Sequence, residues 1–139
     1  MAEALIRQRV ENCVKVLRAK DIDGVMSLYA PNVISFDIVP PLRYVGADNK
    51  RRAWQEAFAA YGAIAYEVRD LNVTTHGELA FVHSLNHVNG TLASGHITDL
   101  WLRWTACFRR IGGVWLVVHD HVSVPADFEH GQAVLNLTP

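Results

Sequence analysis

Two aspartates stand in apolar segments, where a bare carboxylate would be costly to bury. Asp120 lies in the segment GVWLVVHDHVSV, and Asp37 lies in VISFDIVPP. Because side chains alternate across a strand, Asp120 would be the one charge on an otherwise aliphatic face. That face also carries Val114, Leu116, Val118, Val122 and Val124. A carboxylate in such a place must be paired, be neutralised or line a cavity. The two aspartates therefore predict a small enclosed site with acid and base groups.

Histidines on the opposite face of that strand raise the alternative of a metal site. The opposite face carries Trp115, Val117, His119, His121 and Ser123. The spacing of His119 and His121 can chelate zinc, and His83 and His87 share a face of a neighbouring predicted strand. No Cys or Glu stands close enough in sequence to complete a recognisable motif, and the face assignment turns His119 and His121 away from the cavity. We therefore predict no metal site, and hydrogen bonding at an interface for these histidines.

The elements that would position the aspartates begin with helices. Apolar residues spaced by three and four predict an amphipathic helix over residues 2–19. Asp21 or Asp23 can cap a short second helix, which includes Tyr29 and ends at Pro31. These helices would precede the first strand.

A short strand and a third helix follow. Residues 33–37 have the pattern of a strand. Asp48 can cap a helix that runs to Tyr61, with Gly62 as its C-cap. One face of this helix carries Trp54, Ala57, Phe58 and Tyr61.

The second half of the chain changes to a period of two, which is typical of strands. The predicted strands cover residues 64–75, 79–88, 96–110 and 114–124. Turns are predicted at His76-Gly77, Asn89-Gly90 and Gly112-Gly113. The tail after Pro125 has no pattern. Helices followed by long sequential strands predict an α+β architecture, with the helices on one face of an antiparallel sheet.

The two faces of the strand over residues 96–110 differ. The apolar face carries Thr98, Leu100, Leu102, Trp104, Ala106 and Phe108, and should meet the helices. The other face carries Asp99, Trp101, Arg103, Thr105, Cys107 and Arg109. Aromatic and Arg side chains among polar groups are typical of an interface core. We therefore predict a homodimer formed through the outer sheet face.

Composition limits the classes of protein. The 139 residues fit one domain, residues 1–139; half are hydrophobic and the formal net charge is −1. The Lys50-Arg51-Arg52 run is the closest approach to a basic cluster and is interpreted as a solvated helix face, so nucleic acid is not expected as a partner. Cys13 and Cys107 are interpreted as buried free thiols in a reducing compartment. No signal peptide or membrane span is expected, and we predict a cytoplasmic protein.

The order of these elements, with AKDIDGVMSLYAPNVISFD near the start and WLVVHDHVS near the end, resembles the NTF2-like superfamily. This superfamily includes ketosteroid isomerase, SnoaL-type polyketide cyclases, limonene epoxide hydrolase and the association domain of calcium/calmodulin-dependent protein kinase II. The resemblance covers almost the whole chain. It implies a cone-shaped fold, in which three N-terminal helices pack on a curved, mainly antiparallel sheet that encloses a pocket.

The resemblance to ketosteroid isomerase carries over to individual residues. The base of that enzyme falls on Asp37, a supporting pocket Tyr falls on Tyr29, and another aromatic position falls on Trp54. Its oxyanion-hole Tyr falls on Cys13, a much weaker donor, and its oxyanion-hole Asp falls near Trp104 or Ala106, which cannot replace it. The pattern keeps the base and loses the electrophilic half, so steroid isomerase activity is not expected. Asp120 falls where epoxide hydrolases of this fold place a catalytic carboxylate, but the rest of their Asp-Arg-Asp set is not evident.

We predict a small-molecule pocket that abstracts a proton next to a carbonyl, as in isomerisation, dehydration or cyclisation. Asp37 would be the base, and Asp120 a protonated acid or hydrogen-bond donor. Tyr29 and Asn86 would orient the substrate oxygen, and no cofactor is required. Ser84 would either help Asn86 to bind ligand or simply pair with it. Further ligand contacts would come from Trp54, Trp104 and Cys13.

Three alternatives stay open at this point. Asp37 could be a strand-end carboxylate that accepts backbone N–H bonds near Pro40-Pro41. Asp120 could be a buried partner for an Arg or a Tyr hydroxyl. The whole chain could be a non-catalytic ligand-binding or oligomerisation module of the same fold.

Overall fold

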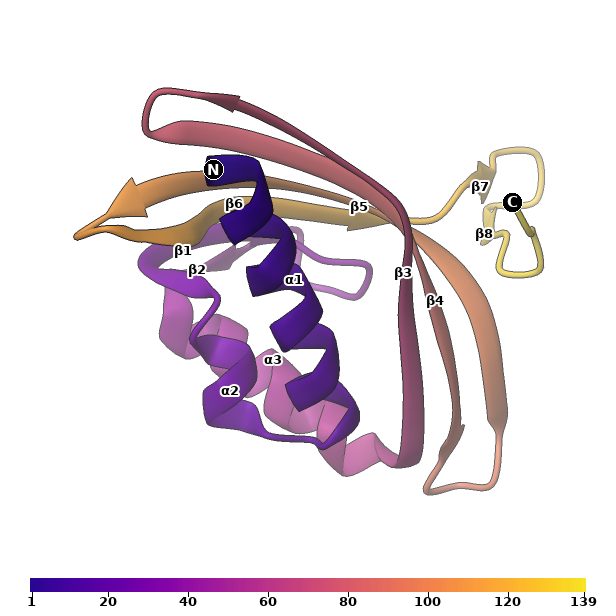
Figure 1. Cartoon of the computed structure of the whole chain (residues 1–139). Coiled ribbons are helices and arrows are strands. Elements are labelled where there is room, and N and C mark those ends of the chain that lie inside the picture. Colours follow the sequence, from indigo (N-terminus) through magenta and orange to yellow (C-terminus); the bar gives the residue numbers. More distant parts are fainter.

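The computed structural model describes residues 1–139 and has helices packed on one side of a bent sheet (Figure 1). The elements are α1 (Ala2–Arg18), α2 (Ile22–Met26), β1 (Tyr29–Phe36), β2 (Tyr44–Val45), α3 (Ala47–Ala60), β3 (Tyr61–His76), β4 (Leu79–Leu92), β5 (Ile97–Ile111), β6 (Val114–Ser123), β7 (Ala126–Asp127) and β8 (Gln132–Ala133). The six-stranded sheet has the order β2-β1-β6-β5-β4-β3, and β7 pairs with β8. Only β1 and β6 run parallel. The predicted α+β cone is confirmed.

The helices follow the apolar periodicity closely. Ile6, Val10 and Leu17 of α1 are buried, as the three-and-four spacing predicts. At the start of α2, the Asp21 side chain accepts a hydrogen bond from the backbone N–H of Gly24 at 3.1 Å. A Cβ on Gly24 would lie 2.8 Å from the Cβ of Val16, so a glycine allows α2 to pack closely on α1.

The boundary between α2 and β1 was predicted wrongly. Tyr29 is the first residue of β1, where it pairs with Val117 of β6. The register between these strands is irregular from Tyr29 to Ile34, so Pro31, which has no N–H to donate, causes no loss in a regular ladder. Gly62 is also not a C-cap: α3 ends at Ala60, and β3 begins at the next residue.

The hairpin between β4 and β5 turns later than predicted. The Asn89-Gly90 pair lies within β4, and the turn comes after Leu92. Gly90 is needed for a different reason, because a Cβ there would lie 2.5 Å from the carbonyl oxygen of Ala63 on β3. The turns predicted at His76-Gly77 and Gly112-Gly113 are confirmed within one residue.

A β-bulge changes the parity of β6. Phe108 of β5 pairs with Val117, and Cys107 pairs with His119, so Val118 is an extra residue in β6. Before the bulge, Trp115 and Val117 are buried, and the prediction that they face outward is wrong. After the bulge, Asp120 is buried as predicted, with 1% of its surface exposed. A one-residue slip moves every preceding side chain to the other face, so the bulge divides the strand into a wrongly and a correctly predicted half.

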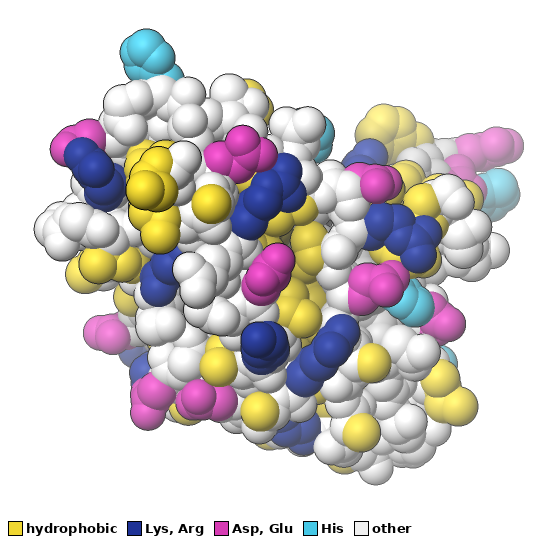
Figure 2. Space-filling model, viewed as in Figure 1, with side chains coloured by type: hydrophobic (Ala, Val, Ile, Leu, Met, Phe, Trp, Pro, Cys, Tyr) yellow, Lys and Arg dark blue, Asp and Glu magenta, His cyan; other side chains and the backbone are white.

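One apolar core lies between the helices and the concave side of the sheet. Its buried members include Ile6, Val33, Val82, Phe108 and Trp115. The C-terminal segment, predicted to have no pattern, forms the β7–β8 hairpin beyond the main sheet (Figure 1). None of the helices has the length and apolarity to cross a membrane. On the face shown in Figure 2, basic and acidic side chains are interspersed rather than gathered by sign.

Candidate active site in the apolar cavity

A cavity of about 650 Å³ opens between the helices and the concave side of the sheet. Of the 29 residues that line it, 24 are hydrophobic, so few polar groups are available to orient a ligand. Seven of the eight predicted site residues are among them: Cys13, Tyr29, Asp37, Trp54, Asn86, Trp104 and Asp120. A volume and lining of this kind are typical of small-molecule sites.

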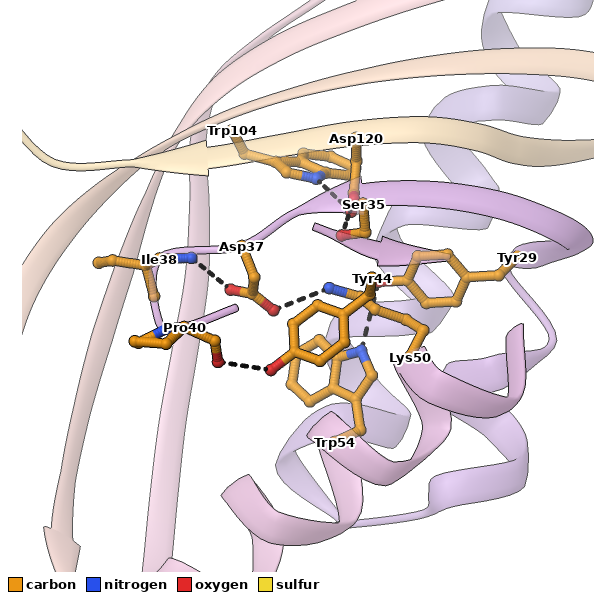
Figure 3. Close-up of polar contacts among 10 residues, drawn as sticks. All are labelled: Tyr29, Ser35, Asp37, Ile38, Pro40, Tyr44, Lys50, Trp54, Trp104 and Asp120. Atoms are coloured by element: carbon orange, nitrogen blue, oxygen red, sulfur yellow. Dashed lines mark hydrogen bonds and ion pairs between the residues drawn. The ribbon is translucent and has the colours of Figure 1, made fainter. Parts of the chain in front are cut away.

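Asp37 lies just beyond the end of β1, and its carboxylate has two fixed donors (Figure 3). Lys50 Nζ donates to Oδ2 at 2.9 Å, and the backbone N–H of Ile38 donates to Oδ1 at 2.7 Å. The Asp37 side chain keeps 19% of its surface exposed, whereas that of Lys50 keeps 2%. The Asp37 carboxylate therefore accepts a backbone hydrogen bond, as expected if it were only a strand-end carboxylate. It also forms an ion pair with the buried Lys50 ammonium.

Lys50 is the main residue that the sequence reasoning missed. We predicted a solvated face for Lys50-Arg51-Arg52, and for Lys50 this is wrong. Its Nζ lies 5.7 Å from the ring centre of Tyr29 and 5.8 Å from that of Trp54. The signal was present in the sequence, because Lys50 precedes Trp54 by four residues and Phe58 by eight, and residues so spaced share one helix face.

Tyr29 and Trp54 complete the surroundings of Lys50 (Figure 3). Trp54 Nε1 donates to the Tyr29 hydroxyl at 3.3 Å, and the Tyr29 hydroxyl proton has no acceptor within the protein. Burial first, and the negative charge of Asp120 second, hold the pKa of Tyr29 well above its usual value. Tyr29 is therefore a neutral hydrogen-bond donor at the cavity wall.

Asp120 lies on the sheet side of the cavity and has only neutral partners (Figure 3). The Ser35 hydroxyl of β1 donates to Oδ1, and the Trp104 indole N–H of β5 donates to Oδ2 at 3.3 Å. The Arg or Tyr partner considered for Asp120 is absent. Ser35 was not among the predicted residues, although it shares the parity of Val33 on β1, and both are fully buried.

Asn86 belongs to a third polar group on β3 and β4. The Ser84 hydroxyl donates to Asn86 Oδ1 at 2.6 Å, and Asn86 Nδ2 donates to the Tyr66 hydroxyl at 2.6 Å. Ser84 is not in the cavity wall, so of its two predicted roles the structure shows the pairing with Asn86. Tyr66, which the sequence reasoning missed, lines the cavity.

Cys13 lies on α1 at the cavity wall and is a free thiol, as is Cys107. Each of the two cysteines keeps part of its surface exposed, so neither is fully buried. Burial is the largest cause that raises the pKa of Cys13 to about 12; the nearby Arg9 lowers it and Asp120 raises it. The thiol is thus a neutral, weak donor.

His119 and His121 lie outside the cavity. His119 Nδ1 is 2.7 Å from the carbonyl oxygen of Ile34, and both imidazoles pack edge-on against Phe36. No group of three or more His, Cys, Asp or Glu side chains is placed to hold a metal ion. The outer face also holds Trp101, whose ring stacks on His87 and lies under the Arg69 guanidinium.

Solved structures share the fold of this chain. An NTF2-like protein of unknown function from Pseudomonas putida KT2440 is 32% identical, with a TM-score of 0.90 over 99% of this chain and 96% of that chain. A ketosteroid isomerase-like protein from Erwinia carotovora atroseptica is 24% identical, with a TM-score of 0.74 over 86% and 93%. A protein from Xanthomonas campestris, provisionally described as a calcium/calmodulin-dependent protein kinase II association domain, is 16% identical, with a TM-score of 0.74 over 85% and 84%. The last two likenesses show the fold alone.

The amino-acid sequence, as well as the fold, identifies the family of this chain. No curated protein matches it. Residues 6–127 match the SnoaL-like domain family, a span that contains every polar residue of the cavity described above. The chain therefore belongs to the SnoaL-like domain family and has the NTF2-like fold.

Proposed function

We propose that the protein is an acid–base enzyme that isomerises, dehydrates or cyclises a small, largely apolar carbonyl or hydroxyl compound. The observation that carries this proposal is the Asp37 carboxylate, fixed by two donors at the wall of an apolar cavity of about 650 Å³. Each carboxylate oxygen accepts one hydrogen bond and keeps a lone pair that can take a proton. Asp37 is thus the general base.

The other polar groups of the cavity have separate roles in this proposal. Tyr29 offers its free hydroxyl proton to a substrate oxygen, and Asn86 offers its second N–H. Asp120 contributes a further carboxylate and would act as a hydrogen-bond partner at the sheet side of the cavity. Trp54, Trp104 and Cys13 contact the apolar part of the ligand. No step in this chemistry requires a cofactor.

Exchange of α-protons for deuterium tests the base directly, without knowledge of the natural substrate. The probes are cyclic ketones from cyclohexanone to 2-tetralone in D₂O, followed by NMR. The protein should accelerate exchange for at least one ketone, and Asp37→Asn should slow that exchange by about 10²–10⁴-fold, the usual contribution of a general base. Thermal-shift titration with the same ketone checks that the variant still folds and binds. Exchange at the buffer rate for every ketone would contradict the proposal.

We also propose that the chain forms a homodimer through the outer face of the sheet. Ile34 and Phe36 are 37% exposed there and Phe81 is 47% exposed. The bulge corrects the predicted membership of this face, since Leu116 and Val118 replace the buried Trp115 and Val117. Light scattering at micromolar concentration should give twice the mass of one chain, and Phe36→Glu should give the mass of one chain. A single-chain mass for the unchanged protein would disprove the dimer.

A further inference from the structure

The Lys50 ammonium has fewer partners than its burial requires. Its side chain is 2% exposed and lines the cavity. An ammonium has three N–H donors, and Lys50 makes one hydrogen bond, to Asp37 Oδ2 at 2.9 Å. Buried donors are normally all satisfied, so two donor positions of Lys50 are left for an acceptor that the protein does not supply.

The groups around Lys50 identify the place of that acceptor. The rings of Tyr29 and Trp54 lie within 6 Å of Nζ and attract its charge, but they offer no lone pair along an N–H. Tyr29, whose hydroxyl proton is also unused, lies in the same cluster (Figure 3). An acceptor oxygen on a ligand in the cavity would satisfy Lys50 and Tyr29 together.

We propose that Lys50 binds the carbonyl oxygen of the substrate and stabilises the enolate formed when Asp37 removes a proton from the α-carbon. This inference rests on the proposed function and deepens it. The C–H bond breaks, and its electron pair forms the C=C bond of the enolate. The π electrons of the carbonyl move to oxygen, and the proton goes to Asp37. In a β,γ-unsaturated ketone the enolate is conjugated with the C=C bond, and return of that proton to the γ-carbon re-forms the carbonyl and gives the isomer. In a β-hydroxy ketone the carbonyl re-forms, the enolate electrons make the Cα=Cβ bond, the Cβ–O bond breaks, and the proton joins the leaving hydroxyl as water.

The spacing of Lys50 and Asp37 fits the α-carbon and the carbonyl oxygen of a ketone. Lys50 Nζ and Asp37 Oδ2 are 2.9 Å apart. The α-carbon and the oxygen of a ketone are separated by roughly 2.4 Å, from ordinary C–C and C=O bond lengths. The carbonyl oxygen of a ketone can therefore contact the Lys50 ammonium while the hydrogen on its α-carbon contacts the Asp37 carboxylate.

The charges of the cavity further define the substrate class. Lys50 is the one cationic side chain in the wall, and Asp37 already balances it. Asp120 adds a carboxylate whose partners are neutral. A substrate with its own carboxylate or phosphate would face uncompensated negative charge. The geometry thus points to a neutral, enolisable ketone or aldehyde with an apolar body.

Two ligands separate oxygen binding from cavity binding. 2-Naphthol is a flat analogue of an enol, and 2-methylnaphthalene replaces its hydroxyl by a methyl group of similar size. Titration calorimetry gives the affinity ratio of the two ligands. This ratio should be about tenfold higher for the unchanged protein than for Lys50→Met, because hydrogen bonds to charged groups are among the stronger ones. Lys15→Met, at an exposed position of α1 outside the cavity, is the matched control and should keep the ratio.

The exchange assay then tests the catalytic part. Lys50→Met should slow deuterium exchange of 2-tetralone by about 10²–10³-fold, the usual loss on removal of one oxyanion donor. Its affinity for 2-methylnaphthalene should stay unchanged, which shows that the cavity is intact. If Lys50→Met keeps both the affinity ratio and the exchange rate while Asp37→Asn loses exchange, the Lys50 inference is overturned and the proposed function stands. If the unchanged protein accelerates no exchange, the proposed function fails first.

Discussion

Asp37 and Asp120 line one cavity, but their negative charges are compensated in different ways. Asp37 faces a buried ammonium at 2.9 Å and keeps part of its surface in solvent. Asp120 has almost no exposed surface and accepts hydrogen bonds from a hydroxyl and an indole, both neutral. Its partners Ser35 and Trp104 lie on β1 and β5, the two strands that flank β6.

Because of this difference, the Asp37–Lys50 pair can accept a new hydrogen-bond partner at little cost in free energy, whereas Asp120 cannot. A ligand oxygen can approach the ammonium of Lys50 without removing any strand contact, since two of its donors are free. A change at Asp120 disturbs hydrogen bonds that join three neighbouring strands. We therefore expect substitutions at the two carboxylates to differ in kind, and the following predictions test that expectation.

The largest effect on stability should come from Asp37→Asn. It leaves the Lys50 charge buried beside a neutral amide, and loss of one partner from a buried ion pair costs about 3 kcal/mol of unfolding free energy. Lys50→Met should cost only about 1 kcal/mol, because the remaining carboxylate is partly exposed and keeps its bond from Ile38. The double variant should be more stable than Asp37→Asn alone. Urea unfolding measures all three.

A surface pair provides the control for this asymmetry. Arg7 and Glu3 form an ion pair on α1 with exposed side chains. Glu3→Gln should change the unfolding free energy by less than about 0.5 kcal/mol. Equal and additive losses for Asp37→Asn and Lys50→Met would show that the buried pair behaves like this surface pair, and the proposed contrast would be lost.

The sequence predicted the secondary structure well where one periodicity decided it. The spacing in α1 and the alternation in β5 were sufficient, because each element buries a single face. The bulge at Val118 could not be read in this way. It depends on the pairing of Val117 and His119 with β5, and one strand's alternation does not report its register with the next. The turn predicted at Gly90 was wrong for a similar reason. A glycine is needed there because a carbonyl on the neighbouring strand β3 leaves no room for a Cβ.

The site was predicted in part, and the missing part has a physical explanation. Asp37 and Asp120 stood out because a charge in an apolar segment is conspicuous. Lys50 did not stand out, since its neighbours Arg51 and Arg52 are also basic and suggested a solvated run. Its spacing from Trp54 carried the contrary signal. Helical periodicity, applied to charged as well as apolar residues, would have placed Lys50 on the buried face.

Asp120→Asn should destabilise the protein less than Asp37→Asn does. An amide has one acceptor oxygen, so Ser35 or Trp104 would face its NH₂ group and remain without an acceptor. A buried donor left unsatisfied costs about 1–3 kcal/mol, which urea unfolding can measure. Ser35→Ala removes one of the two donors and leaves Oδ1 of the buried carboxylate without a partner, so it should also cost about 1–3 kcal/mol. If neither Ser35→Ala nor Asp120→Asn changes the unfolding free energy, the proposed hydrogen-bond arrangement is contradicted.

The smallest expected effect is a change in the pKa of Cys13 when the negative charge of Asp120 is removed. Burial is the largest cause that raises the pKa of Cys13 to about 12, with Arg9 opposing it and Asp120 adding to it; Asp37 is not among the causes. Asp120→Asn should therefore lower the pKa of Cys13, and Asp37→Asn should not. The pH dependence of iodoacetamide labelling, in a Cys107→Ser background that leaves one thiol, measures this difference.

The raised pKa of Cys13 also determines whether its contribution to stability rises or falls at alkaline pH. The Cys13 thiol has a pKa of 9.0 when unperturbed and about 12 in the folded chain, so above pH 9 the folded state binds more protons than the unfolded state. Its contribution to stability is complete below pH 9 and falls as the pH rises toward 12, by up to about 1.4 kcal/mol per pH unit for one proton. Cys13→Ser should remove the slope between pH 9 and pH 10; above pH 10, Tyr29 and Tyr66, whose pKa values burial also raises, contribute a slope of the same sign. If the slope is unchanged in Cys13→Ser, the thiol is not the group that titrates. If Asp37→Asn lowers the pKa of Cys13 as much as Asp120→Asn does, the charge of Asp37 is not compensated by Lys50, and the two carboxylates are alike.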